Sequence, residues 1–199
     1  MAIKFQYNKI SMQLLGKQLK IRQRALPTIK NKESALRMEV KKAKDKVQEL
    51  DSLLEAEMLK YSGMSGLWNE FKPSLIRVEN VVLSQKKIAG VSTPLLQNIE
   101  FTVKEFSMFE SPVWYYDGIE ILKELVKIAV EREVFTKKME LLEKARRKTT
   151  QKVNLYEKVQ IPGFQEAILK IKRFMEDEDN LSKSSQKIVK NRQMMEASA

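Results

Sequence analysis

The stretch that decides the fold runs from residue 12 to residue 54 and reads MQLLGKQLKIRQRALPTIKNKESALRMEVKKAKDKVQELDSLL. Steps of alternately three and four residues through it reach an apolar side chain at nearly every position. This spacing places the side chains in one narrow stripe along a helix, which is the pattern of a coiled coil. The apolar positions of this first seam are Met12, Leu15, Leu19, Leu26, Ile29, Leu36, Val40, Ala43, Val47, Leu50 and Leu54.

Only Arg22 and Glu33 interrupt the first seam. Pro27 removes a backbone donor, but the seam continues in phase on both sides of it, so we expect a bend within one helix. Two separate helices are the alternative. Asn8 or Ser11 would cap the helix at its start.

A second seam of the same kind follows Gly118 and predicts a second long helix. Arg132 and Arg146 interrupt it, and either one, paired with Glu33, would set the register of the two helices. The phase slips near Pro162, which predicts a kink followed by more helix with Phe164, Ile168, Ile171 and Met175 on its apolar face. The apolar positions of the second seam are Ile121, Leu125, Ile128, Phe135, Met139, Leu142, Val153 and Tyr156.

Between the seams the pattern changes to that of a β-hairpin. β-branched residues and period-two alternation predict strands near residues 75–85 and 97–106. The intervening loop, residues 85–94, would carry an exposed tip made by Ile88, Gly90, Val91 and Pro94. Aromatic residues flank the hairpin, and they predict a small aromatic core, with a ligand pocket as the alternative. They are Trp68, Phe109, Trp114, Tyr115 and Tyr116.

Two long helices with one narrow seam each bury those seams by folding back on each other. The predicted fold is therefore mainly α, a long antiparallel two-helix coiled coil with a β-hairpin and short helical insert. Residues 1–62 and 118–195 would form the coiled coil and residues 63–117 the insert, as one structural unit. A parallel homodimeric coiled coil is the rival arrangement.

Composition excludes many activities. The chain of 199 residues has no cysteine and no histidine, which removes thiol nucleophiles, histidine bases and Cys/His metal sites. No phosphate-binding or dinucleotide-binding glycine motif occurs, and the acidic run at residues 176–179 is interpreted as a solvated helix face. The sequence thus predicts an interaction protein without catalytic, metal or cofactor site.

The positive charge is concentrated in the first 50 residues, which carry +9 of the formal net charge of +11. A solvated lysine-rich helix face, a surface for an acidic protein partner and a nucleic-acid footprint are the three interpretations. No apolar leader and no membrane-spanning run is present, so we expect a cytoplasmic protein.

Three stretches resemble the D subunit of the V-type and A-type rotary ATPases. Residues 153–162, VNLYEKVQIP, match that family's V-N-x-x-E-x-V-x-I-P segment and are followed by Ala167, Ile168 and Ile171. Leu19, residues 29–32 and Leu36 resemble its N-terminal L-K-x-K-x-x-x-L pattern. Residues 88–91 with Pro94 resemble its hairpin tip.

The resemblance implies a non-catalytic central rotor shaft, peripheral to the membrane, that transmits torque between a hexamer of catalytic A and B subunits and the ion-translocating ring. Both termini would project into the hexamer, and the hairpin end would bind the F subunit and a funnel-shaped subunit, with no nucleotide, cofactor or nucleic acid bound. A basic coiled-coil adaptor for nucleic acid or an anionic membrane surface is the alternative function. The candidate contacts in the hexamer cavity are Lys17, Lys20, Arg22, Arg24, Lys170, Lys172 and Arg173.

Overall fold

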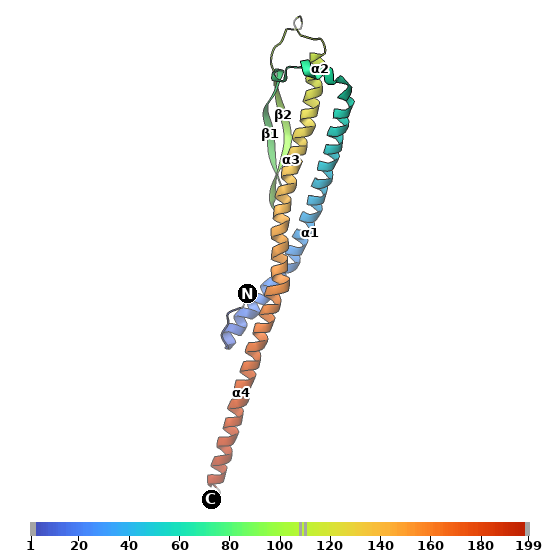
Figure 1. The fold of residues 1–199 in the computed structure, drawn as a ribbon. Helices are drawn as coiled ribbons and strands as arrows, with labels where there is room; N and C mark the ends of the chain where they lie inside the picture. The colour runs from blue at the N-terminus through green and yellow to red at the C-terminus, as the bar shows by residue number, and fades with distance from the viewer. Residues whose placement is uncertain (1–2, 108, 110, 198–199) are drawn as a thin grey trace. The chain divides into compact units, whose positions relative to one another are not determined.

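The computed structural model describes residues 3–107, 109 and 111–197. A two-stranded antiparallel hairpin falls between the long N-terminal and C-terminal helices in the order of the chain, which confirms the predicted fold class (Figure 1). The helices are α1 (Lys9–Lys60), α2 (Ser65–Glu70), α3 (Tyr115–Asn154) and α4 (Ile161–Ala197), and the strands are β1 (Ile76–Ile88) and β2 (Val91–Val103). Short 3₁₀ turns cover Ser62–Met64 and Pro73–Leu75, and a π-helical turn covers Leu155–Gln160.

Internal contacts divide the molecule into two compact units. The terminal unit comprises Met1–Asn31 and Thr149–Ala199, and the hairpin unit comprises Lys32–Lys148. Each unit has its own buried cluster of apolar side chains. The two clusters are therefore separate cores, each within its own unit.

Helix α1 begins where the sequence predicts. The Asn8 side-chain oxygen accepts a hydrogen bond from the Ser11 backbone N–H at 2.7 Å, so Asn8 is the N-cap. Pro27 lies inside α1, which confirms one continuous helix and excludes the two-helix alternative.

In the terminal unit, α1 and the C-terminal helices run antiparallel. Arg22 Nε donates to Gln160 Oε1 at 2.6 Å, and Lys30 Nζ lies 2.6 Å from Glu157 Oε1, so residue numbers rise along one helix as they fall along the other. The core beside these contacts is formed by Leu15, Phe164, Ala167 and Ile171, with Ile3, Phe5, Met12, Leu19, Ile168 and Met175 packed against it.

The predicted phase slip corresponds to the π-helical turn, Leu155–Gln160, which ends two residues before Pro162. A π turn contains one residue more than an α turn, which rotates the residues that follow it around the helix axis. It also widens the helix next to the proline, whose ring would otherwise clash with the preceding turn. The apolar face therefore resumes at Phe164, which is buried.

In the hairpin unit, α1 and α3 are also antiparallel, because Asp51 pairs with Arg132 at 2.5 Å and Glu33 with Arg146 at 3.9 Å. Helix α3 begins at Tyr115, three residues before the predicted start at residue 118. The earlier start is stabilised by the aromatic core, because the buried Tyr115 ring lies 5.2 Å from both Phe71 and Trp114.

The aromatic core joins α2, α3 and the base of the hairpin. Its buried members are Phe71, Leu75, Tyr115 and Ile119, with Trp68, Ile76, Phe106, Trp114 and Leu122 packed against it. Phe109 and Tyr116, which the sequence analysis grouped with these residues, are exposed. The predicted aromatic core is thus present, without Phe109 and Tyr116.

The hairpin is longer and its turn tighter than predicted. β1 and β2 pair as far as Ile88 and Val91, so a two-residue turn at Ala89 and Gly90 replaces the expected loop at residues 85–94. Pro94 therefore lies within β2, opposite Gln85, and not at the tip. A proline is tolerated there because both strands of a two-stranded sheet are edge strands.

Both turn residues have positive φ, 48° at Ala89 and 78° at Gly90. This backbone suits a type I′ turn, in which asparagine or glycine is favoured at the first position and alanine is strained.

We expect Ala89→Asn to stabilise the hairpin unit by about 0.5–1 kcal/mol, measured by urea denaturation. The matched control is Ala56→Asn on the exposed face of α1, which should destabilise by roughly 0.5 kcal/mol. Equal effects at the two positions would contradict the turn assignment.

Candidate interaction surfaces

The predicted seam residues are all buried or half-buried. The buried ones are Leu15, Leu36, Ala43, Leu50 and Leu142. The half-buried ones are Met12, Leu19, Leu26, Ile29, Val40, Val47, Leu54, Ile121, Leu125, Ile128, Phe135, Met139, Val153 and Tyr156. Apolar contact between helices therefore occupies one face of each, while α3 also buries Val134 outside the predicted seam.

The hypothesis that Glu33 pairs with an arginine of the second seam is confirmed for Arg146 at 3.9 Å. Arg146 also donates two hydrogen bonds of 2.7 Å to Glu143, and Arg147 donates one of 3.0 Å to the same carboxylate. Arg132 has a different partner, Asp51. Sequence reasoning missed Glu143 because it lies outside the seam, although its spacing of three and four residues from two arginines was a readable signal.

Hydrogen bonds from Arg146, and secondarily from Arg147, lower the pKa of Glu143 to about 2, well below the usual range of a glutamate. A carboxyl with a lower pKa in the folded state stabilises the protein above its unfolded pKa, and this contribution is lost as pH falls toward 2.

We expect Glu143→Gln to cost about 1 kcal/mol at neutral pH, because Arg146 loses its charged acceptor while solvent still screens the site. Between about pH 4.5 and pH 2, the free energy of unfolding of the variant should also fall by less than that of the parent chain. Urea denaturation across this pH range measures both effects. Glu140→Gln, an exposed position one turn earlier, is the control, and an identical pH profile for the two variants would contradict the assignment.

Arg22 differs from the other candidate cavity contacts, because it is engaged within the terminal unit. Besides its bond to Gln160, its guanidinium carbon lies 4.6 Å from the centre of the Phe164 ring. Half-buried in this way, Arg22 forms a polar layer in the helix pair and is less available to a partner than predicted. The sequence analysis did not identify Gln160, although it lies four residues after the seam residue Tyr156 and so continues the three-four spacing.

The remaining candidates have exposed side chains on the terminal unit. They are Lys17, Lys20, Arg24, Lys170, Lys172 and Arg173. Lys170 lies 2.8 Å from Glu166 and Lys172 lies 3.6 Å from Glu176, each along its own helix. Pairs at such exposed positions contribute little stability and separate at little cost, so these lysines can still contact another molecule.

The hairpin tip lies in the hairpin unit, with Ile88 and Val91 half-buried and paired across the turn and Gly90 exposed. Gly90 lies close to α1, because a Cβ added to it would be 3.4 Å from Lys32 Nζ. Farther from the tip, Leu83 and Pro94 share a groove with Leu141 of α3. The hairpin thus lies along the helix pair of its unit, and Figure 1 shows β1 and β2 beside α3.

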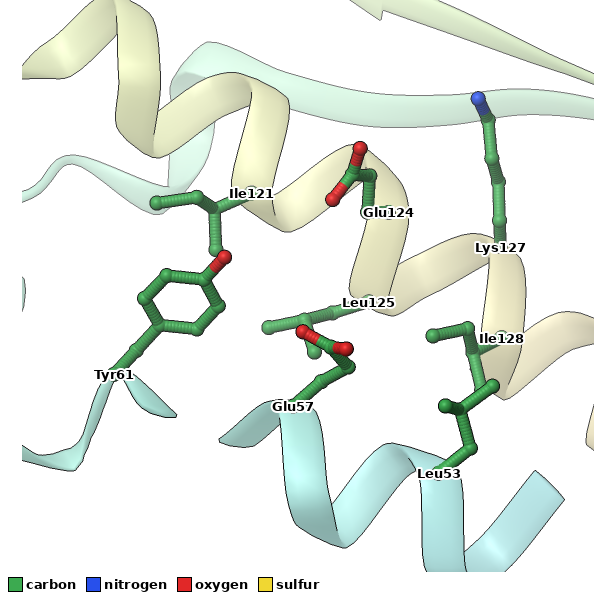
Figure 2. Close-up of a pocket in the computed structure, with 8 residues that line it drawn as sticks. All are labelled: Leu53, Glu57, Tyr61, Ile121, Glu124, Leu125, Lys127 and Ile128. Atoms are coloured by element: carbon green, nitrogen blue, oxygen red, sulfur yellow. The ribbon is translucent and has the colours of Figure 1, made fainter. Parts of the chain in front are cut away.

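A cavity of about 360 Å³ opens between the end of α1 and the start of α3 (Figure 2). Leu53, Leu125 and Ile128 contribute apolar walls, and the carboxylate of Glu57 is held 2.6 Å from Lys60. Tyr61 closes one side of the cavity. The space is therefore open, with apolar walls and one carboxylate, Glu57, that is paired with a lysine.

Two further observations concern the described residues as a group. Among residues 3–107, 109 and 111–197, the acidic side chains form no cluster of three or more that could hold a metal ion. In the same part of the chain, no helix combines the length and apolar character needed to cross a bilayer.

These features define a class of protein: an antiparallel helical hairpin with an inserted β-hairpin, whose exposed helix faces carry charge and are suited to contacts with other chains. Residues 11–191 match the family model that describes the D subunit of ATP synthase. The chain belongs to this family.

Individual relatives agree with the family match. The chain is 35% identical over 178 residues to the V-type ATP synthase D subunit of Borreliella burgdorferi, covering 87% of each chain. It is 28% identical over 157 residues to the protein of the same name from Chlamydia abortus, covering 76% of each, and 27% identical over 186 residues to that of Chlamydia pneumoniae, covering 89% of this chain and 87% of the relative.

Proposed function

We propose that this chain is the central rotor shaft of a V-type or A-type ATPase and transmits torque between a catalytic hexamer of A and B subunits and a membrane ion-translocating ring. The chain itself hydrolyses no nucleotide in this proposal. It lies in the cytoplasm, peripheral to the membrane. The names of its relatives, which call them the D subunit of a V-type ATP synthase, support membership of such a complex.

One observation carries the proposal. Every described side chain of α4 from Glu176 to Glu196 is exposed, and Figure 1 shows α4 continuing well past the start of α1 within the terminal unit. A single helix without a packed face is marginal in water. The family match nevertheless extends along this helix to residue 191. We therefore infer that the helix is buried against other subunits. We propose that this segment enters the hexamer, with Lys17, Lys20, Arg24, Lys170, Lys172 and Arg173 facing acidic groups of its inner wall.

At the other end of the proposed shaft, the insert of residues 63–117 would contact the F subunit and a funnel-shaped subunit above the membrane ring. The hairpin unit supports this assignment because it presents exposed apolar side chains on the hairpin, including Leu83 and Leu95, and on α2, Leu67. Exposed apolar side chains such as these are suited to contact with another protein.

A truncation tests the torque role. In the whole complex, a chain ending at Met175 keeps the core of the terminal unit, whose last members are Ile171 and Met175. We expect the complex to assemble and hydrolyse ATP while ATP-driven ion transport falls at least about tenfold, because the exposed helix no longer engages the hexamer. A chain ending at Asn191, the last residue of the family match, is the control and should stay coupled. Full coupling without residues 176–199 would reject the proposal.

The concentration of positive charge in the first 50 residues favours one competing function, a basic adaptor for nucleic acid or anionic membranes. Such binding weakens steeply with salt. Binding of duplex DNA or anionic vesicles by the full chain at about 50 mM salt, lost at higher salt, would support the adaptor, and no binding at about 50 mM would eliminate it.

A further inference from the structure

The exposed part of α4 carries a regular apolar ridge. Phe174, Leu181 and Ile188 recur every seven residues, and their side chains are 45%, 70% and 55% exposed. Met195 continues the spacing and is 72% exposed. Seven residues are two helical turns, so these side chains lie in line along one face, as in one half of a coiled-coil seam.

The other half of this seam is polar and changes sign along the helix. Four residues after each ridge position come Glu178, Ser185 and Arg192 in turn. The surrounding charges follow the same order, with acids at residues 176–179 and bases at Lys183, Lys187, Lys190 and Arg192. The ridge therefore has an acidic end and a basic end.

This order of charges selects an orientation for a pair of identical ridges. A parallel pair in register would set Glu178 against Glu178 and Arg192 against Arg192, which is repulsive at both ends. An antiparallel pair that sets Leu181 opposite Ile188 also sets Phe174 opposite Met195. Glu178 of one copy then lies within one residue of Arg192 of the other, and this happens twice because of the two-fold symmetry.

We propose that, in the free protein, the ridge of α4 pairs antiparallel with the ridge of a second copy of this chain. This inference goes beyond the rotor function, since it concerns the chain before it joins a larger assembly. One ridge cannot be covered by two partners at once, so self-pairing and entry into a hexamer compete. The pair would keep the apolar ridge buried until the chain joins the larger complex.

Sedimentation equilibrium of the full chain tests the pairing over about 1–100 µM. We expect a monomer–dimer equilibrium in this range. The double variant Leu181→Ser, Ile188→Ser should raise the dissociation constant at least about a hundredfold, because each dimer loses four apolar side chains, which form two facing pairs. Leu169→Ser, which removes an exposed leucine outside the ridge, is the control and should dimerise like the parent chain. A chain that stays monomeric throughout the range overturns the proposal and leaves the ridge to a different protein.

Charge exchange tests the orientation. Glu178→Arg alone and Arg192→Glu alone should each raise the dissociation constant about tenfold, because two attractions per dimer become repulsions. The double variant restores the opposite charges and should recover most of the affinity. Additive weakening in the double variant would contradict the antiparallel pairing.

Cross-linking gives an independent measure, because the natural chain has no cysteine. Ser185 lies next to the two-fold centre of the proposed pair, so Ser185→Cys should form disulfide-linked dimers under a mild oxidant. Met195→Cys should not, because its two copies would lie at opposite ends. Cross-linking at residue 195 would instead indicate a parallel pair. None of these experiments measures the coupling of ATP hydrolysis to ion transport. Their outcome therefore does not decide the rotor proposal, which the truncation tests.

Discussion

Replacing Leu142 by alanine is expected to lower the free energy of unfolding by about 2–5 kcal/mol, the range for a leucine lost from a packed core. Leu142 of α3 is 0% exposed and belongs to the seam of the hairpin unit, in which Leu36 of α1 is also 0% exposed. A two-helix seam is thin, so few neighbours can move in to fill the space that the leucine leaves.

The neighbouring residue supplies the control. Leu141 is 42% exposed, and Leu141→Ala should cost less than about 1 kcal/mol, because little buried area is removed. Urea denaturation followed by far-ultraviolet circular dichroism measures both variants. Equal losses at the two positions would mean that the seam of α3 does not face α1 as described.

Gly118→Ala should destabilise the hairpin unit by about 1–3 kcal/mol, the usual cost of forcing extra volume into a packed core. A Cβ at Gly118 would lie 2.9 Å from Trp114 Cζ3 and 3.4 Å from Phe71 Cε2. These rings belong to the aromatic core, where Trp114 also contacts Trp68 at 5.4 Å between ring centres. The rings would have to separate to admit one methyl group.

Gly16 is the matched control for this substitution. It lies inside α1, and a Cβ there meets no atom within 4 Å. Gly16→Ala should therefore stabilise by about 0.5–1 kcal/mol, since alanine is the better helix former. Opposite signs for the same change at two helical glycines, measured by thermal denaturation and tryptophan fluorescence, are the expected result. A stabilising Gly118→Ala would contradict the close approach of Trp114.

The long helices and their seams could be predicted because the information is local. Apolar residues at three-four spacing, a capping asparagine before Lys9 and a seam that stays in phase across Pro27 are each readable from a few residues. The phase slip before Phe164 was readable in the same way. Its cause, a π-helical turn, was not, because a kink at Pro162 would account for the same shift in the spacing.

The hairpin was predicted as a motif, but its turn was not. Pro94 and Gly90 were interpreted as parts of one loop, whereas pairing of the strands extends to Ile88 and Val91 and holds Ala89 at positive φ. The energy of many cross-strand contacts outweighs the strain at one alanine. Buried Thr93, which donates to the Lys86 carbonyl at 2.9 Å, is one such contact that its residue type did not signal.

By itself the sequence determined the two seams, the positions of their polar breaks, the uneven charge and the absence of cysteine and histidine, because all of these are properties of residue type and spacing. Only the tertiary structure decided which side chains pair with the polar residues in and beside the seams. Glu33 and Asp51 meet different arginines, Gln160 reaches Arg22, and Glu143 holds Arg146. Long side chains of either helix can reach several positions across a seam, so the choice among them depends on register and rotation, which are set only when both helices pack.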